Sequence, residues 1–347
     1  MNKIQRKSNI ELLRILSMFG VIMLHYNNEQ LGGGLRFVED SSVNYYILIL
    51  LESIYICAVD LFMLISGFFS CHSVQTSVQK PVRLLLQTIL FSFGYTLLIG
   101  IIKGDLLIAN LIDSLVPANF FVILYITVYL LSPYLNLLYG KMDDRFIFII
   151  FTLFSIEPTV VDILAQVTKR EWLGLSTIGM YGSQWGYQIC NFILMYFIGM
   201  YIEKNIENIN KINTRSIFYG IVGTVVAISI CACISRKIGF NRTIVWNYCN
   251  PLVIVEAIFA FVLFRRIEIG TVKWINKLAS ASFGVYLLHG YFLPHIKISW
   301  AVSQNLFVML MHIILSSIGI YLICFLVNGI FDCLYRYIFS NYFKKIS

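Results

Sequence analysis

The stretch IELLRILSMFGVIMLHY, Ile10 to Tyr26, is apolar enough to enter a bilayer, yet it contains Glu11, Arg14 and His25. Ionisable side chains inside a membrane span cost free energy, so by default they indicate a functional site with partners. Arg14 and His25 are eleven residues apart, which at about 100° per residue nearly completes three helical turns and puts both on one face. Along the axis they would lie roughly 16 Å apart, about half the hydrocarbon thickness. One face of this helix is therefore predicted to carry a cation near one membrane surface and an imidazole near mid-depth.

Composition indicates the fold class. The chain has 347 residues, 59% of them hydrophobic and only 13% charged, and a mean hydropathy of +0.78. A soluble globular protein is about a quarter charged, so we expect an all-α, polytopic transmembrane bundle of about ten spans. Residues 1–347 are predicted to form a single integral-membrane domain with no separate soluble domain. The spans are expected at 10–27, 43–69, 82–102, 119–139, 145–165, 184–203, 216–235, 247–265, 280–300 and 306–339.

The basic residues indicate topology rather than nucleic-acid binding. The net charge is +8, but the lysines and arginines lie in short loops, which favours contact with the lipid bilayer and its anionic headgroups. Most of them fall in the alternate loops that lie on the same side of the membrane as the N-terminus. This distribution predicts that both termini are cytoplasmic. The loop from Arg236 to Arg242 runs against this trend. A basic N-terminus before an apolar core resembles a signal peptide, but no small-residue cleavage site follows, and a retained first helix is expected.

The eight cysteines are scattered along the chain. Most fall within apolar segments, where cysteine commonly acts as a small hydrophobic packing residue. We therefore expect neither a disulfide framework nor a metal site.

Two interpretations of the first span remain open. Glu11 and Arg14 are spaced to pair across one helical turn, and Arg14 then either anchors the helix at the headgroups or serves a site. A lone histidine on an apolar face is more often a packing residue. For His25, however, the alignment with Arg14 and an imidazole that titrates near neutral pH favour proton transfer.

The second span and the loop after it supply further candidates. Asp60 lies in or at the edge of the span and needs a cation or a hydrogen-bond donor. Ser66 and Gly67 permit close approach of a helix or a ligand, helix packing being the commoner case. Lys80 and Arg83 either bind phosphate groups from the cytosol or merely follow the positive-inside rule, which is more usual.

In the ninth expected span, helical spacing places Ser282, Tyr286 and His289 on one face. These polar residues either belong to a functional site or line a water-filled cavity in which no reaction takes place.

Three of these motifs together carry a family resemblance. Glu11-Leu-Leu with Arg14-x10-His25, the stretch VDLFMLISGFF at 59–69 and the stretch SFGVYLLH at 282–289 resemble the acyltransferase 3 family, which includes bacterial surface-polysaccharide O-acetyltransferases. The resemblance covers nearly the whole chain in order. Two departures are visible: NFFV at 119–122 stands where the family often has Trp-Phe-Leu, and Lys80 replaces the first arginine of Arg-x-x-Arg. Lysine keeps the charge but lacks the bidentate fork. The hydrolase-like domain fused to some relatives is not expected here.

The resemblance implies transfer of an acyl group, most often acetyl, to a hydroxyl of a cell-surface polysaccharide or its lipid-linked precursor. The donor would be a cytoplasmic acyl-CoA such as acetyl-CoA, a substrate rather than a bound cofactor. The protein would be multi-pass in the bacterial cytoplasmic membrane, beside polysaccharide-synthesis machinery.

Roles for the candidate residues follow from this chemistry. Three cations would hold the donor phosphates, and His25 would take the proton of the acceptor hydroxyl. Three further side chains would orient His25 or stabilise the oxyanion, and the sequence does not assign one of these two roles to each of them. The expected donor-binding residues are Arg14, Lys80 and Arg83, the expected catalytic residues are His25, Asp60, Tyr286 and His289, and the supporting residues are Glu11, Ser66 and Ser282; no metal ligand is expected.

Two other function classes remain open. A transporter or flippase for lipid-linked glycans would also have about ten spans with buried polar groups, but it should show internal two-fold hydropathy symmetry and broken helices near the midplane. A polysaccharide-export partner without chemistry of its own is the second alternative.

Overall fold

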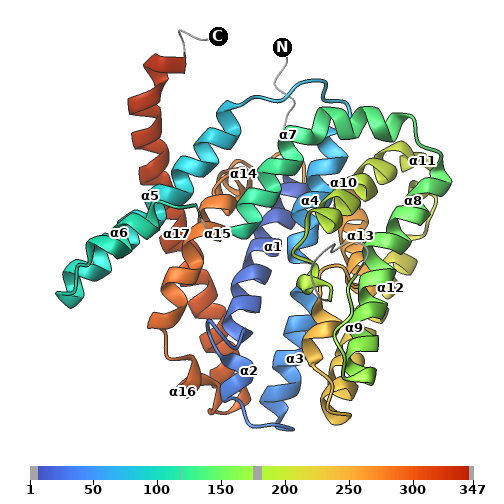
Figure 1. Cartoon of the computed structure of the whole chain (residues 1–347), viewed down its shortest axis with the longest axis horizontal. Helices are drawn as coiled ribbons and strands as arrows, with labels where there is room; N and C mark the ends of the chain where they lie inside the picture. The colour runs from blue at the N-terminus through green and yellow to red at the C-terminus, as the bar shows by residue number, and fades with distance from the viewer. Residues whose placement is uncertain (1–6, 118, 175–181, 344–347) are drawn as a thin grey trace. The chain divides into compact units, whose positions relative to one another are not determined.

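The structure is a computed structural model that describes residues 7–117, 119–174 and 182–343. These residues are overwhelmingly helical and contain no β-strand, which confirms the all-α prediction (Figure 1). Eight helical segments within the described ranges are long and apolar enough to cross a membrane. A helix satisfies all its backbone hydrogen bonds internally, which is the condition for crossing hydrocarbon.

The helices group into two compact units, and the chain alternates between them. The first unit contains α1 (Ser8–Asn27), α2 (Gly34–Phe37), α5 (Gln79–Lys103), α6 (Ile108–Ser114), α14 (Lys273–Ala279), α15 (Ser282–Phe292), α16 (Ile298–Val302) and α17 (Leu306–Phe343). Within it, α1 packs against α14, α15 and α17. Phe19 on α1 and Tyr321 on α17 stack with their ring centroids 4.8 Å apart.

The second unit is built around one close helix pair. It contains α3 (Val43–Tyr55), α4 (Ala58–Ser70), α7 (Phe120–Gly140), α8 (Asp144–Phe151), α9 (Glu157–Thr168), α10 (Ile189–Lys204), α11 (Ile206–Asn210), α12 (Thr214–Lys237) and α13 (Pro251–Arg266). The most extensive packing in this unit joins α4 to α10. Local sequence signals start several of its helices: Asn250 caps α13 by accepting a 3.0 Å hydrogen bond from the Leu252 backbone N–H, and Pro251 fits the first turn.

Two of the expected spans contain shorter helices. The span expected at 184–203 holds the 16-residue α10, preceded by a 3₁₀ turn in which Gln184 and Trp185 have positive φ. The span expected at 280–300 holds the 11-residue α15. Beyond it, Pro294 lies in a 3₁₀ turn, because proline lacks the N–H that would continue an α-helix. The last helix, α17, has 38 residues and so exceeds the roughly 20 needed for one crossing, in keeping with the expected range 306–339.

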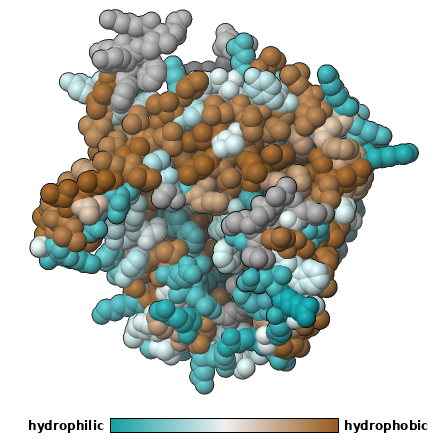
Figure 2. All heavy atoms as spheres, in the orientation of Figure 1, coloured by the Kyte–Doolittle hydropathy of each residue, from teal (hydrophilic) through white to brown (hydrophobic). Residues whose placement is uncertain are grey.

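The outward faces of these helices remain apolar. On α5 and α6, Leu98, Ile101, Ile102 and Ile108 are each more than half exposed, and apolar side chains gather on this part of the surface in Figure 2. Contiguous exposed apolar surface is rare on soluble monomers. These faces therefore suit contact with lipid, consistent with a membrane protein.

Candidate functional site

The polar face of α1 carries both residues that the sequence singled out. Arg14 donates a 2.9 Å hydrogen bond to Glu11, which confirms the predicted i,i+3 pair. The Glu11 side chain is 5% exposed and that of Arg14 is 29% exposed. The carboxylate is therefore buried beside its cation, while Arg14 keeps part of its surface for other contacts.

His25, near the C-terminal end of α1, meets His289 of α15. Nδ1 of His25 and Nε2 of His289 are within hydrogen-bonding distance, and the two rings lie almost parallel, 4° apart, with centroids separated by 4.7 Å. His289 is 3% exposed, whereas His25 is only half-buried. The pair therefore presents one accessible imidazole backed by one buried imidazole.

The hydrogen bonds of His289 define the tautomers of the pair. Its Nδ1 lies 3.1 Å from the carbonyl oxygen of Val285, and a carbonyl only accepts, so Nδ1 carries the proton. In neutral His289, Nε2 is then an acceptor, and the Nδ1–H of His25 donates to it. The remaining lone pair of neutral His25 is on Nε2. This assignment leaves a base with its lone pair at a defined atom and its ring orientation fixed from behind.

The α15 helix carries two further predicted residues. Tyr286 lies with its ring centroid 5.8 Å from that of His289, whereas Ser282, which is 5% exposed, lies about two helical turns before His289. Gly284 faces α17, where an added Cβ would overlap the side chain of Asn328. Because only glycine permits this approach, α15 is held close against α17.

A basic pocket of about 520 Å³ opens at the ends of α5, α14 and α17. Its cations are Arg83, Lys277 and Arg336. Arg83 forms a 2.5 Å ion pair with Asp332, and its guanidinium lies 5.4 Å from the ring centroid of Tyr335. Such a group of cations suits a phosphate-bearing ligand.

The sequence prediction captured only part of this pocket. Arg83 lines it, but Lys80 is not among its lining residues. Lys277 and Arg336 were missed as site candidates, and their only signal was their place in segments predicted to face the cytosol.

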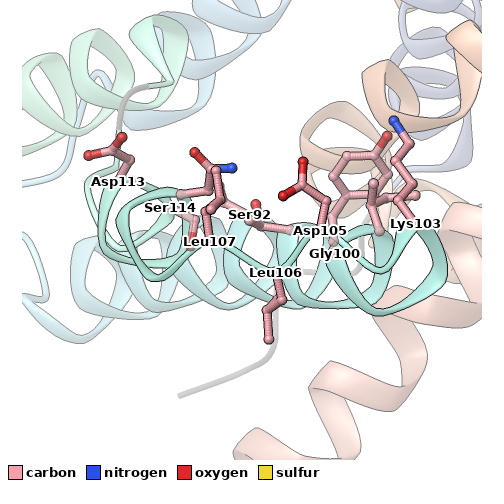
Figure 3. Close-up of a pocket in the computed structure, with 12 residues that line it drawn as sticks. Ser92, Gly100, Lys103, Asp105, Leu106, Leu107, Asp113 and Ser114 are labelled. Carbon is pink, nitrogen blue, oxygen red and sulfur yellow. The ribbon is translucent and has the colours of Figure 1, made fainter.

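A second pocket, of about 510 Å³, lies along α5 and α6. Figure 3 shows Lys103, Asp105 and Asp113 among the side chains that line it. Tyr95, which also lines this pocket, stacks on Tyr291 of α15 with centroids 4.2 Å apart. The pocket thus combines charged groups with an aromatic side chain.

Two predicted residues, Asp60 and Ser66, belong to the second unit. Asp60 is 2% exposed and accepts a 3.1 Å hydrogen bond from the Asn191 side chain. The Ser66 hydroxyl donates to the Phe62 carbonyl at 2.9 Å, within its own helix. Their contribution to the site in the first unit stays a prediction.

One further histidine was missed by the sequence reasoning. His312 on α17 lies with Nδ1 2.9 Å from the hydroxyl of Tyr26, the residue directly after His25. Nothing in the local pattern of α17 indicated this contact, because it joins segments 286 residues apart.

Comparison with known proteins gives one match. A family model described as an acyltransferase domain matches residues 7–329 of the chain. This range includes every candidate residue that the sequence predicted, whereas Asp332, Tyr335 and Arg336 of the basic pocket lie beyond it. No curated protein and no solved structure matches the chain significantly.

Proposed function

We propose, because the chain belongs to the acyltransferase 3 family, that it transfers an acyl group from a cytoplasmic acyl-CoA to a hydroxyl of a cell-surface polysaccharide or its lipid-linked precursor. Family membership and the apolar helices make it a membrane acyltransferase. We propose further that the acyl group is acetyl, that the donor is acetyl-CoA and that the acceptor is a glycan hydroxyl.

The observation that carries the proposal is the His25–His289 pair. Nε2 of His25 would take the proton of the acceptor hydroxyl as its oxygen attacks the thioester carbonyl. The carbon–sulfur bond then breaks, and the CoA thiolate takes that proton back from His25. His289 holds the other ring proton of His25 on Nδ1, so neutral His25 has its lone pair on Nε2 before the proton is taken and again after it is returned.

Charge supports the donor assignment. CoA is polyanionic, and the cations of the basic pocket, Arg83, Lys277 and Arg336, would neutralise its phosphates. Arg14 and Lys80, singled out from the sequence, are proposed as further donor contacts. The paired state of Arg83 with Asp332 means that donor phosphate would compete with this carboxylate.

The pocket in Figure 3 is our proposed place for the acceptor sugar. Its carboxylates and amide, Asp105, Asp113 and Asn110, offer acceptors and donors for sugar hydroxyls, and Tyr95 offers an aromatic face. Lys103 follows the third expected span, 82–102. With a cytoplasmic N-terminus, this span runs outward, so Lys103 would lie on the side opposite to the donor, where an extracellular acceptor would be.

The test is mass spectrometry of surface glycans from cells with and without the protein. We expect loss of one acetyl mass per modified repeat in its absence, and the same loss with His25→Ala protein present in the membrane at normal levels. Normal acylation by folded, inserted His25→Ala protein would rule the mechanism out. Unchanged acylation with altered glycan export would instead favour the export-partner alternative.

A further inference from the structure

The closest helix crossing in the second unit depends on two glycines. A Cβ at Gly67 of α4 would overlap the backbone of Tyr196 on α10, and a Cβ at Gly199 of α10 would overlap the backbone of Leu64 on α4. Glycine at such crossings lets helix backbones approach closely. The residues one turn further along each helix are therefore also held near one another.

Those residues are Cys71, four positions after Gly67, and Glu203, four positions after Gly199. His72 follows Cys71 directly, and its Nε2 lies 3.1 Å from Oε1 of Glu203. One ligand-capable atom from each of Cys71, His72 and Glu203 lies within 4.8 Å of the others. The crossing thus assembles a thiol, an imidazole and a carboxylate at the shared C-terminal ends of α4 and α10.

We propose that Cys71, His72 and Glu203 bind a thiophilic divalent cation of the zinc type, in a site separate from the acyl-transfer chemistry. Thiolate sulfur, imidazole nitrogen and carboxylate oxygen are the three ligand types that zinc takes in proteins, and three protein ligands leave a fourth position for water. The tetrahedral geometry of zinc requires ligand atoms about 3 to 4 Å apart. The His72 and Glu203 side chains are 83% and 33% exposed, which leaves them room to rotate toward this spacing.

The environment suits this assignment. In the predicted topology α4 and α10 both end at the cytoplasmic surface, where cysteines stay reduced and available as ligands. Binding replaces the thiol proton of Cys71 by the metal, and the proton leaves to solvent. A cation there would join the ends of α4 and α10 and stabilise their crossing.

The alternative is an ordinary surface arrangement. His72 and Glu203 then form only a hydrogen bond, and the Cys71 thiol keeps its 3.2 Å hydrogen bond to the Phe68 carbonyl. The two interpretations differ in one measurable property, a metal–thiolate bond.

Cobalt(II) serves as the probe, because thiolate–cobalt charge transfer gives an absorption band in the near ultraviolet. The full chain is purified in detergent without a polyhistidine tag, treated with a chelator and titrated with Co²⁺. We expect a thiolate band that saturates at one equivalent and is displaced by Zn²⁺. Cys71→Ser should abolish the band, while Cys231→Ser, which removes an exposed cysteine on α12, should leave it unchanged.

A second measurement covers the case in which Cys71→Ser fails to fold. His72→Ala alters an 83%-exposed side chain and should fold normally, yet weaken Zn²⁺ binding roughly tenfold or more in competition with a chromophoric chelator. Absence of a thiolate band in the unmodified protein would overturn the proposal. So would an equal band in Cys71→Ser, or equal zinc affinity in His72→Ala. Acyl transfer is not a readout here, so the result is independent of the proposed function.

Discussion

Replacing His289 by alanine removes the acceptor that orients His25. The Nδ1–H of His25 then loses its partner, and the proton is free to move to Nε2, the atom proposed to act as base. A hydrogen bond lost inside a protein, with one group left unsatisfied, costs about 1 to 3 kcal/mol. If this cost is added in full to the activation free energy of acyl transfer, the transfer rate decreases roughly 5- to 160-fold.

The structure also offers a variant that should partly restore this function. Glutamine at position 289 can place its amide oxygen near the position of Nε2 and accept from His25. We therefore expect His289→Gln to be faster than His289→Ala. His72→Ala is the matched control, since His72 is 83% exposed and belongs to the unit that does not contain His25 and His289.

The assay is the initial rate of labelled acetyl transfer from acetyl-CoA to extracted surface glycan, with protein in nanodiscs. Melting temperatures of all variants are measured in parallel, so that loss of fold is separated from loss of rate. A folded His289→Ala protein with the unmodified rate, beside an inactive His25→Ala protein, would refute the positioning role. Equal losses in His289→Ala and His289→Gln would refute the assigned tautomers.

Further predictions concern the basic pocket, Arg14 and the α4–α10 crossing. Arg83→Ala should raise KM for acyl-CoA about 3- to 10-fold with little change in kcat, since one charge contact is worth about 1 kcal/mol. Asp332→Asn should not raise KM, because it removes the carboxylate that pairs with Arg83. Equal KM values for Arg83→Ala and the unmodified protein in steady-state kinetics would contradict this prediction. Arg14→Ala should reduce glycan acetylation measured by mass spectrometry, and normal acetylation would favour its anchoring role. Gly67→Ala should destabilise the protein by about 1 to 3 kcal/mol in thermal unfolding, whereas Gly94→Ala, with open space around it, should not; equal melting temperatures would contradict the close crossing.

Most of the fold follows from local pattern. Long apolar runs predict membrane helices because hydrocarbon requires internally paired backbone. The pattern was less informative at 184–203, where α10 begins only after a positive-φ turn, and at 280–300, where α15 ends before Pro294. Hydropathy measures average composition, and it does not report where one turn interrupts an apolar run.

The candidate site, like the fold, could be predicted from the sequence only in part. Composition and helical periodicity were enough to predict the all-helical membrane class, the shared face of Arg14 and His25, and the Glu11–Arg14 pair, because periodicity acts within a few residues. The pairing of His25 with His289, 264 residues away, became visible only in the folded chain. The folded chain also groups Lys277 and Arg336 with Arg83. Which helix faces meet depends on packing between segments far apart in the chain, and spacing within one segment carries no information about that choice.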